Sequence, residues 1–90
     1  MSSERPRYGI EFTNSAAKEL WKLKRKDLRR RLLVAIAALA DNPRPSGARK
    51  LAGSEAWRIR IGAHRVVYLI EDRKLLVLLV TVADRRDAHR

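Results

Sequence analysis

The chain has 90 residues, no cysteine and a formal net charge of +11, from 21 basic and 10 acidic side chains. This length corresponds to one domain, residues 1–90, and the lack of cysteine excludes a disulfide scaffold and any zinc or redox site built on thiols. The basic residues are spread over both halves of the chain, which indicates nucleic acid, the ribosome or an acidic protein as the partner.

The N-terminal half predicts one strand and two helices. Residues 7–12 (RYGIEF) alternate weakly and are rich in β-formers, which indicates a strand. Residues 13–15 are N-cap formers, and the helical spacing of the apolar residues after them predicts a helix over residues 15–24. A second helix is expected from Asp27, which can start or cap it, to the proline of Asn42–Pro43, because its apolar residues form a stripe: Leu28, Leu32, Ile36 and Leu39.

The C-terminal half predicts three strands. Residues 44–55 contain the prolines and glycines of a loop. Residues 57–61 alternate between apolar and basic side chains, and residues 64–70 follow across a two-residue turn, Gly62–Ala63. Residues 75–82 are apolar at both parities, as expected for a central strand covered on both faces. The fold class is therefore α+β with the order β-α-α-β-β-β: a small antiparallel β-sheet with an N-terminal α-hairpin packed on one face.

No segment predicts a signal peptide or a membrane span. The first seven residues lack an apolar stretch. The longest apolar run, residues 75–83 with one threonine in it, is far shorter than the roughly 20 residues that span a bilayer. We expect a soluble, cytoplasmic protein with no membrane partner.

The predicted turn brings three arginines together. With Gly62 and Ala63 as the loop, Arg60 lies opposite Arg65, about 5 Å away at Cβ, and Arg58 lies on the same face. Like charges repel on a sheet face, so this patch indicates a polyanionic ligand. Arginine binds two phosphate oxygens at once and stabilises the charge of a pentacoordinate phosphorus. An error of one residue in the loop would move Arg65 to the other face.

The basic tail after the last predicted strand supplies two further candidates. Arg85 is among the first residues after the strand and is expected to join the arginine patch. His89 is the one tail residue that exchanges a proton near neutral pH. A solvated tail whose histidine has no role fits the same residues.

Other polar and aromatic residues have two interpretations each. Basic side chains on the predicted helices, in the loop and in the tail bind RNA or the ribosome in one interpretation, and form a solvated surface in the other: Lys24, Arg25, Lys26, Arg29, Arg30, Lys50 and Arg86. His64 falls on the apolar face, which favours a half-buried structural histidine. Trp57 and Tyr68 are expected in the core rather than as platforms for bases. Two histidines, no cysteine and no carboxylate cluster predict no metal, and no motif predicts a cofactor.

Four segments of the chain resemble the RelE/ParE superfamily of type II toxins. They are IEFTNSAAKEL, ARKLAGSEAWRIRIGAHRVVYLI, LLVLLVTV and DRRDAHR. The resemblance implies a ribosome-dependent, metal-independent mRNA interferase, in which the 2′-hydroxyl of the mRNA attacks the adjacent phosphate in the ribosomal A site. It implies catalytic roles for the basic residues that match the motif: Arg58, Arg60, Arg65 and Arg85.

The tail departs from the motif of many relatives at two positions. Asp84 stands where a histidine is usual, and His89 stands where a tyrosine is usual. Histidine can stack on a base and transfer a proton, as tyrosine does, so the resemblance makes His89 the candidate general acid or base.

The resemblance also implies partners and alternatives. Toxins of this kind are held in a hetero-oligomer by a cognate antitoxin, whose acidic or amphipathic segment wraps the sheet and helices, and their targets are the ribosome and mRNA. A ParE-like inhibitor of DNA gyrase without catalytic residues shares the fold. A basic module that binds the ribosome or RNA without cleaving is the third possibility.

Overall fold

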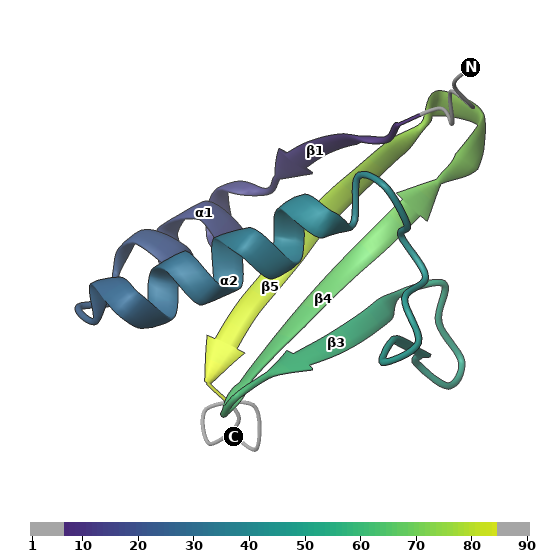
Figure 1. Ribbon diagram of the computed structural model, residues 1–90. Helices are drawn as coiled ribbons and strands as arrows, with labels where there is room; N and C mark the ends of the chain where they lie inside the picture. The colour runs from purple at the N-terminus through teal and green to yellow at the C-terminus, as the bar shows by residue number, and fades with distance from the viewer. Residues whose placement is uncertain (1–6, 85–90) are drawn as a thin grey trace.

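The computed structural model describes residues 7–84 and contains two helices, five strands and one 3₁₀ turn within them (Figure 1). In chain order they are β1 (Gly9–Phe12), α1 (Asn14–Trp21), α2 (Lys26–Ala38), β2 (Arg49–Lys50), β3 (Trp57–Ile61), β4 (His64–Glu71), η1 (Asp72–Lys74) and β5 (Leu76–Asp84). The architecture is α+β, with the helices before the main strands, which confirms the predicted class. No helix in this part of the chain is long and apolar enough to cross a membrane.

The five strands form one mixed sheet in the order β1-β5-β4-β3-β2. The three long strands are antiparallel as predicted, but β1 pairs with β5 in parallel, Gly9 with Leu76 through Phe12 with Leu79. The sheet is therefore not purely antiparallel. The parallel pair joins the first and the last strand of the chain. Such a pair needs a crossover connection, which the helices and the strands between β1 and β5 supply. The two-residue β2 lies inside the predicted loop.

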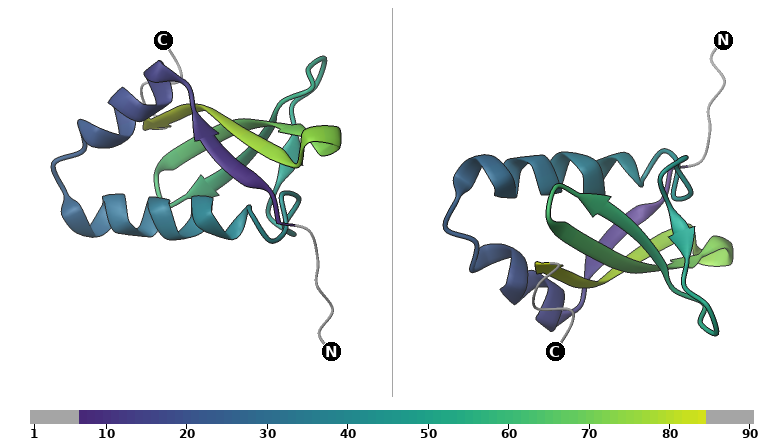
Figure 2. Two further views of the ribbon diagram at one scale, coloured as in Figure 1. Left: turned by 90° about the horizontal axis from the view of Figure 1, so that it is seen from above. Right: turned by 90° about the horizontal axis from the view of Figure 1, so that it is seen from below.

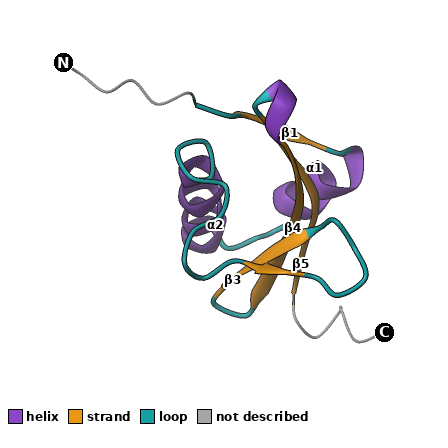
Figure 3. Ribbon diagram, turned by 90° about the vertical axis from the view of Figure 1, so that its right-hand side faces the viewer, coloured by secondary structure: helices purple, strands orange, loops and turns teal. Residues whose placement is uncertain are grey.

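Both helices cover the same face of the sheet. The buried residues of α1 and α2 form one core with those of β3, β4 and β5: Ala16, Leu20, Leu32, Ile36, Leu39, Ile59, Val66, Tyr68, Val77, Leu79 and Val82. Figure 2 shows the helices diverging from their connection, with the strands lying across the opening between them, and Figure 3 shows the twisted sheet from the side. The opposite face carries no helix, so β5 is central without being covered on both faces.

A β-bulge explains part of the apolar pattern of β5, because it brings residues of both parities to the buried face. Thr81 pairs with Val67, but Leu79 pairs with Tyr68, so that β5 has one extra residue, Val80, at this point. The extra residue shifts the alternation. Val77 and Leu79 are buried on one side of it and Val82 on the other.

The helix ends differ from the predicted ones by a few residues. Thr13 caps α1 by accepting a hydrogen bond from the Ala16 N–H at 3.1 Å, within the predicted N-cap segment. The helix ends at Trp21 rather than near residue 24. Asp27 does not cap α2, because the N-cap residue is Arg25; Asp27 lies in the first turn, where the helix dipole favours a carboxylate.

A polar network holds the loop after α2 against the β4–β5 turn. Arg44 donates to both carboxylate oxygens of Asp72, at 3.3 and 2.9 Å, and the Tyr8 hydroxyl donates to the same carboxylate at 2.6 Å. The Arg44 guanidinium also lies over the Trp57 ring, 5.5 Å from its centroid. Below it the buried Tyr68 hydroxyl donates to the Pro43 carbonyl at 2.7 Å. The network fixes the segment that leads into β2.

Candidate nucleic-acid interface

The turn between β3 and β4 has the predicted length and register. Ile61 pairs with His64, Arg60 with Arg65 and Arg58 with Val67, which leaves Gly62 and Ala63 as the loop. Gly62 has a φ of +61°, a backbone conformation that glycine adopts without the steric cost of a side chain. The register prediction is confirmed, and with it the placement of Arg58, Arg60 and Arg65 on one face.

A fourth arginine extends this patch. Arg49 of β2 pairs directly with Arg58 of β3, so the alternation of side chains places it on the same face. We refer to Arg49, Arg58, Arg60 and Arg65 as the arginine cluster. It lies on the sheet face that the helices leave uncovered. The sequence did not reveal Arg49 because a two-residue strand between prolines and glycines has no alternation by which to recognise it.

The arginine cluster is electrostatically strained. The pKa of Arg58 is lowered from its ordinary value, first by partial desolvation and then by the positive charges of Arg60, Arg65 and Arg49. No carboxylate of residues 7–83 forms an ion pair with the cluster. The Nε of Arg65 is buried and has no hydrogen-bond partner. An anion bound at this face would relieve the repulsion and supply the missing acceptor.

Lys50 does not share the face of the arginine cluster. It pairs with Trp57, which places its side chain on the opposite face of the sheet, and its Nζ lies 3.6 Å from a Glu55 carboxylate oxygen.

Three predicted site residues lie outside the described residues: Arg85, Arg86 and His89.

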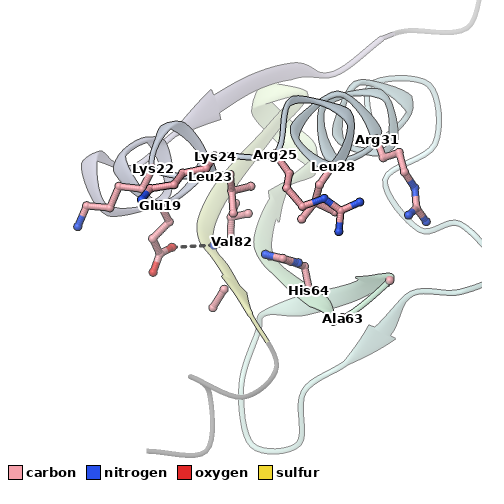
Figure 4. A pocket seen from close by; sticks show the side chains of 12 residues that line it. Glu19, Lys22, Leu23, Lys24, Arg25, Leu28, Arg31, Ala63, His64 and Val82 are labelled. Carbon is pink, nitrogen blue, oxygen red and sulfur yellow. Dashed lines mark hydrogen bonds between the residues drawn. The ribbon is translucent and has the colours of Figure 1, made fainter.

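The basic residues of the helices form a separate surface. Lys24 and Arg25 lie in the connection between α1 and α2 and line a pocket of about 720 Å³, together with Glu19, Lys22, Arg31 and His64 (Figure 4). Lys26, Arg29 and Arg30 line a groove on the outer side of α2 with Leu33, Val34 and Ala37. The Arg29 guanidinium stacks on the exposed Trp21 ring, 4.9 Å from its centroid. The helical residues are therefore not brought together with the arginine cluster.

Tyr68, Trp57 and His64, which were expected to be structural, lie on the sheet face that packs against the helices. Tyr68 is fully buried, Trp57 is partly buried against the core, and His64 is 5% exposed with an Nδ1 that has no hydrogen-bond partner. The core interpretation of the two aromatic residues is confirmed, and His64 is more deeply buried than expected. No group of three histidine or carboxylate side chains that could hold a metal ion occurs among the residues described.

Comparison with known proteins shows the family to which this chain belongs. The family model of the ParE toxin of type II toxin–antitoxin systems matches residues 10–89. Toxin RelG of Mycobacterium tuberculosis is 31% identical over 86 residues, which cover 92% of this chain and 97% of the relative. The chain belongs to the RelE/ParE superfamily of type II toxins. The predicted membership is confirmed.

Solved structures of RelE toxins share the fold of this RelE/ParE toxin. The archaeal RelE–RelB complex from Pyrococcus horikoshii matches with a TM-score of 0.77 at 25% identity, over 88% of this chain and 96% of that chain. The intact RelBE toxin–antitoxin complex of E. coli matches with a TM-score of 0.75 at 28% identity, over 86% of this chain and 95% of that chain. In this chain the fold places the arginine cluster on the uncovered face of the sheet and a second basic surface on the helices and their connection.

Proposed function

We propose that this toxin is a ribosome-dependent, metal-independent endoribonuclease that cleaves mRNA in the ribosomal A site and so inhibits translation. The observation that carries the proposal is the arginine cluster: four guanidinium groups on one uncovered sheet face, with no carboxylate of residues 7–83 paired to them. Such a cluster costs stability through like-charge repulsion unless a polyanion occupies it.

In the proposed reaction the substrate supplies its own nucleophile. The 2′-hydroxyl loses its proton and attacks the adjacent phosphorus, and the bond from phosphorus to the 5′-oxygen of the next nucleotide breaks as that oxygen takes up a proton. The products are a 2′,3′-cyclic phosphate and a 5′-hydroxyl. Arg58, Arg60 and Arg65 bind the non-bridging oxygens and stabilise the charge that develops on them. Arg85 assists, and His89 is the proposed general base or acid.

The helical basic surface has a separate role in this proposal. Lys24, Arg25, Lys26, Arg29 and Arg30 contact the ribosome or the phosphates of flanking RNA, together with Lys50 and Arg86. Such contacts add affinity that falls steeply with salt, and they add no chemistry. A cognate antitoxin holds the toxin in a hetero-oligomer, a role supported by structural relatives that were solved as toxin–antitoxin complexes. In this proposal the antitoxin blocks the arginine cluster or displaces the C-terminal tail.

The test is a translation reaction programmed with a defined mRNA and analysed by primer extension, with and without ribosomes. We expect cuts at A-site codons only when ribosomes are present. Arg65→Ala is expected to lower the cleavage rate by about 10²- to 10³-fold, because it removes a donor to the developing charge. Arg73→Ala, which removes an exposed arginine of η1 far from the hairpin turn, is the matched control. Undiminished cleavage by a folded Arg65→Ala variant would contradict the role.

A second candidate is inhibition of DNA gyrase. Its specific support is the family model, which describes a ParE toxin. This candidate predicts intact mRNA, normal translation and loss of gyrase supercoiling in vitro. Intact mRNA with stalled translation would instead identify a module that binds the ribosome without cleaving.

A further inference from the structure

The last strand of the sheet extends past its neighbour β1. β1 ends at Phe12, which pairs with Leu79, whereas β5 continues to Asp84. On its other edge β5 stays paired with β4 to the end, Arg65 with Ala83 and His64 with Asp84. The backbone groups of β5 that face away from β4 beyond Leu79 therefore need partners other than a strand.

Two side chains from the N-terminal region supply these partners. The Thr13 hydroxyl donates to the Val80 carbonyl at 3.2 Å, and the Val82 N–H donates to Glu19 Oε1 at 2.8 Å (Figure 4). Thr13 also caps α1 through the Ala16 N–H. The partly buried Glu19 is thus the side chain of α1 that holds the end of β5.

The orientation of Glu19 is unusual for its surroundings. Lys22, Lys24, Arg25 and Arg31 line the same pocket, yet no ion pair joins Glu19 to any basic residue of the described segment. Its carboxylate instead accepts a hydrogen bond from a neutral backbone amide. A charged acceptor makes this hydrogen bond stronger than a neutral one, which suits a group that must hold a strand end.

The strand end that Glu19 holds lies beside Arg65. Arg65 is flanked by Arg60 on β3 and by Ala83 on β5, and Ala83 directly follows Val82. Arg60 and Ala83 stand on either side of Arg65 at paired positions, so their side chains share its face of the sheet, and the buried Nε of Arg65 has no hydrogen-bond partner to hold it. Release of the β5 end would remove one of the two strand neighbours that flank Arg65.

We propose that Glu19 is a positioning residue for cleavage: by holding the end of β5 against β4, it fixes Arg65 within the arginine cluster. This inference rests on the proposed endoribonuclease function.

The first arm of the test measures the hydrogen bond itself in the free toxin. Glu19→Ala removes the acceptor, Glu19→Gln keeps an Oε1 that can accept, and Lys18→Ala changes the neighbouring exposed side chain on the same helix. Hydrogen exchange of the Val82 amide, resolved by NMR, is expected to be about tenfold faster in Glu19→Ala, less accelerated in Glu19→Gln, whose neutral acceptor is weaker, and unchanged in Lys18→Ala. Unchanged exchange in Glu19→Ala would overturn the proposal.

The second arm measures single-turnover cleavage of ribosome-bound mRNA over a range of ribosome concentrations. We expect the maximal rate of Glu19→Ala to fall about 10- to 100-fold with an unchanged half-saturating concentration, since a displacement of about 1 Å has effects of this size. Lys18→Ala should match the parent within about twofold, and the rate of Glu19→Gln should lie between those of the parent and Glu19→Ala. Equal losses in Glu19→Ala and Glu19→Gln, or a full rate in Glu19→Ala despite fast exchange, would overturn the positioning role alone. A parent protein that does not cleave would overturn the proposed function and this role together, while the exchange data would still report the hydrogen bond.

Discussion

Arg60 and Arg65 lie directly opposite each other across the β3–β4 hairpin, and neither forms an ion pair with a carboxylate of residues 7–83. Directly opposed like charges on a sheet destabilise the pair. The fold therefore tolerates an unfavourable arrangement that a bound phosphate would make favourable. Functional sites commonly show this conflict between stability and activity.

Neutralising Arg60 should stabilise the toxin while weakening its activity. We expect Arg60→Gln to raise the melting temperature at low ionic strength by about 1–3 °C, because it removes repulsion from Arg65 and Arg58. The gain should shrink at high salt, where surface charges are screened. Thermal unfolding at two salt concentrations measures the effect, with Arg73→Gln as the control. A loss of stability that does not depend on salt would contradict the repulsion.

The glycine of the hairpin turn should be sensitive to substitution through its backbone. Gly62→Ala is expected to lower the free energy of unfolding by about 1–2 kcal/mol, because a residue with a Cβ is disfavoured at a φ of +61°. A Cβ at this position would lie 3.8 Å from an Arg31 guanidinium nitrogen, an ordinary contact, so crowding adds nothing. Gly62→Asn, which tolerates this conformation better, should cost less in urea unfolding. Equal costs for both variants would argue against the backbone explanation.

The buried Tyr68 hydroxyl should contribute to stability through one hydrogen bond. Tyr68→Phe leaves the Pro43 carbonyl without its donor and is expected to cost about 1–2 kcal/mol. Tyr8→Phe removes a hydroxyl bonded to an exposed carboxylate and should cost less. Urea unfolding of the two variants at neutral pH makes the comparison, and a larger loss for Tyr8→Phe would contradict it.

The same tyrosine should make the toxin sensitive to alkaline pH. Burial raises the pKa of Tyr68 to about 12. Because the unfolded pKa is near 10, the neutral phenol stabilises the fold fully below about pH 10, and this contribution is lost as the pH rises through about 12. Absorbance titration of the phenolate should show an ionisation near pH 12 that disappears in Tyr68→Phe. Its persistence in that variant would assign the ionisation elsewhere.

Asp72 should give the toxin a specific sensitivity to acid. The hydrogen bonds from Arg44 and then Tyr8 hold the pKa of the Asp72 carboxyl below its usual value. The stabilisation is therefore present above the unfolded pKa of about 3.9 and is lost as the pH falls through the lower folded pKa. The difference in unfolding free energy between the parent and Asp72→Asn should thus be largest near neutral pH and vanish in strong acid. Glu71→Gln, an exposed neighbour, should not show this pH dependence.

Features that depend on nearby residues could be predicted from the sequence. The alternation of residues 57–61 and the glycine of the turn specify the register of the β3–β4 hairpin, and this register places Arg58, Arg60 and Arg65 together. The apolar stripe of α2 likewise identified its core residues, Leu32 and Ile36. In each case the signal lies within a few residues of the feature, because helix and hairpin periodicities are local.

Features that join distant segments could not be predicted in this way. The parallel pairing of β1 with β5, the bulge at Val80 and the placement of Arg49 beside Arg58 all depend on how the sheet packs. The hydrogen bond between Glu19 and Val82 joins residues 63 positions apart, and no pattern in either segment predicts it. A single acidic residue on a helix has no sequence signal that shows which backbone amide it meets.

The sequence by itself determined the fold class, the family resemblance, the strong positive charge and the face on which three arginines lie. The fold class, the charge and the face of the arginines follow from composition or from short-range alternation, whereas the resemblance rests on four segments that match the motifs of the family. Only the tertiary structure decided that Arg49 completes the arginine cluster, that the helical basic residues lie on another surface, and that Glu19 holds the end of β5. Those relationships arise when the helices bury one face of the sheet and leave the other uncovered, a result of packing between residues far apart in the chain.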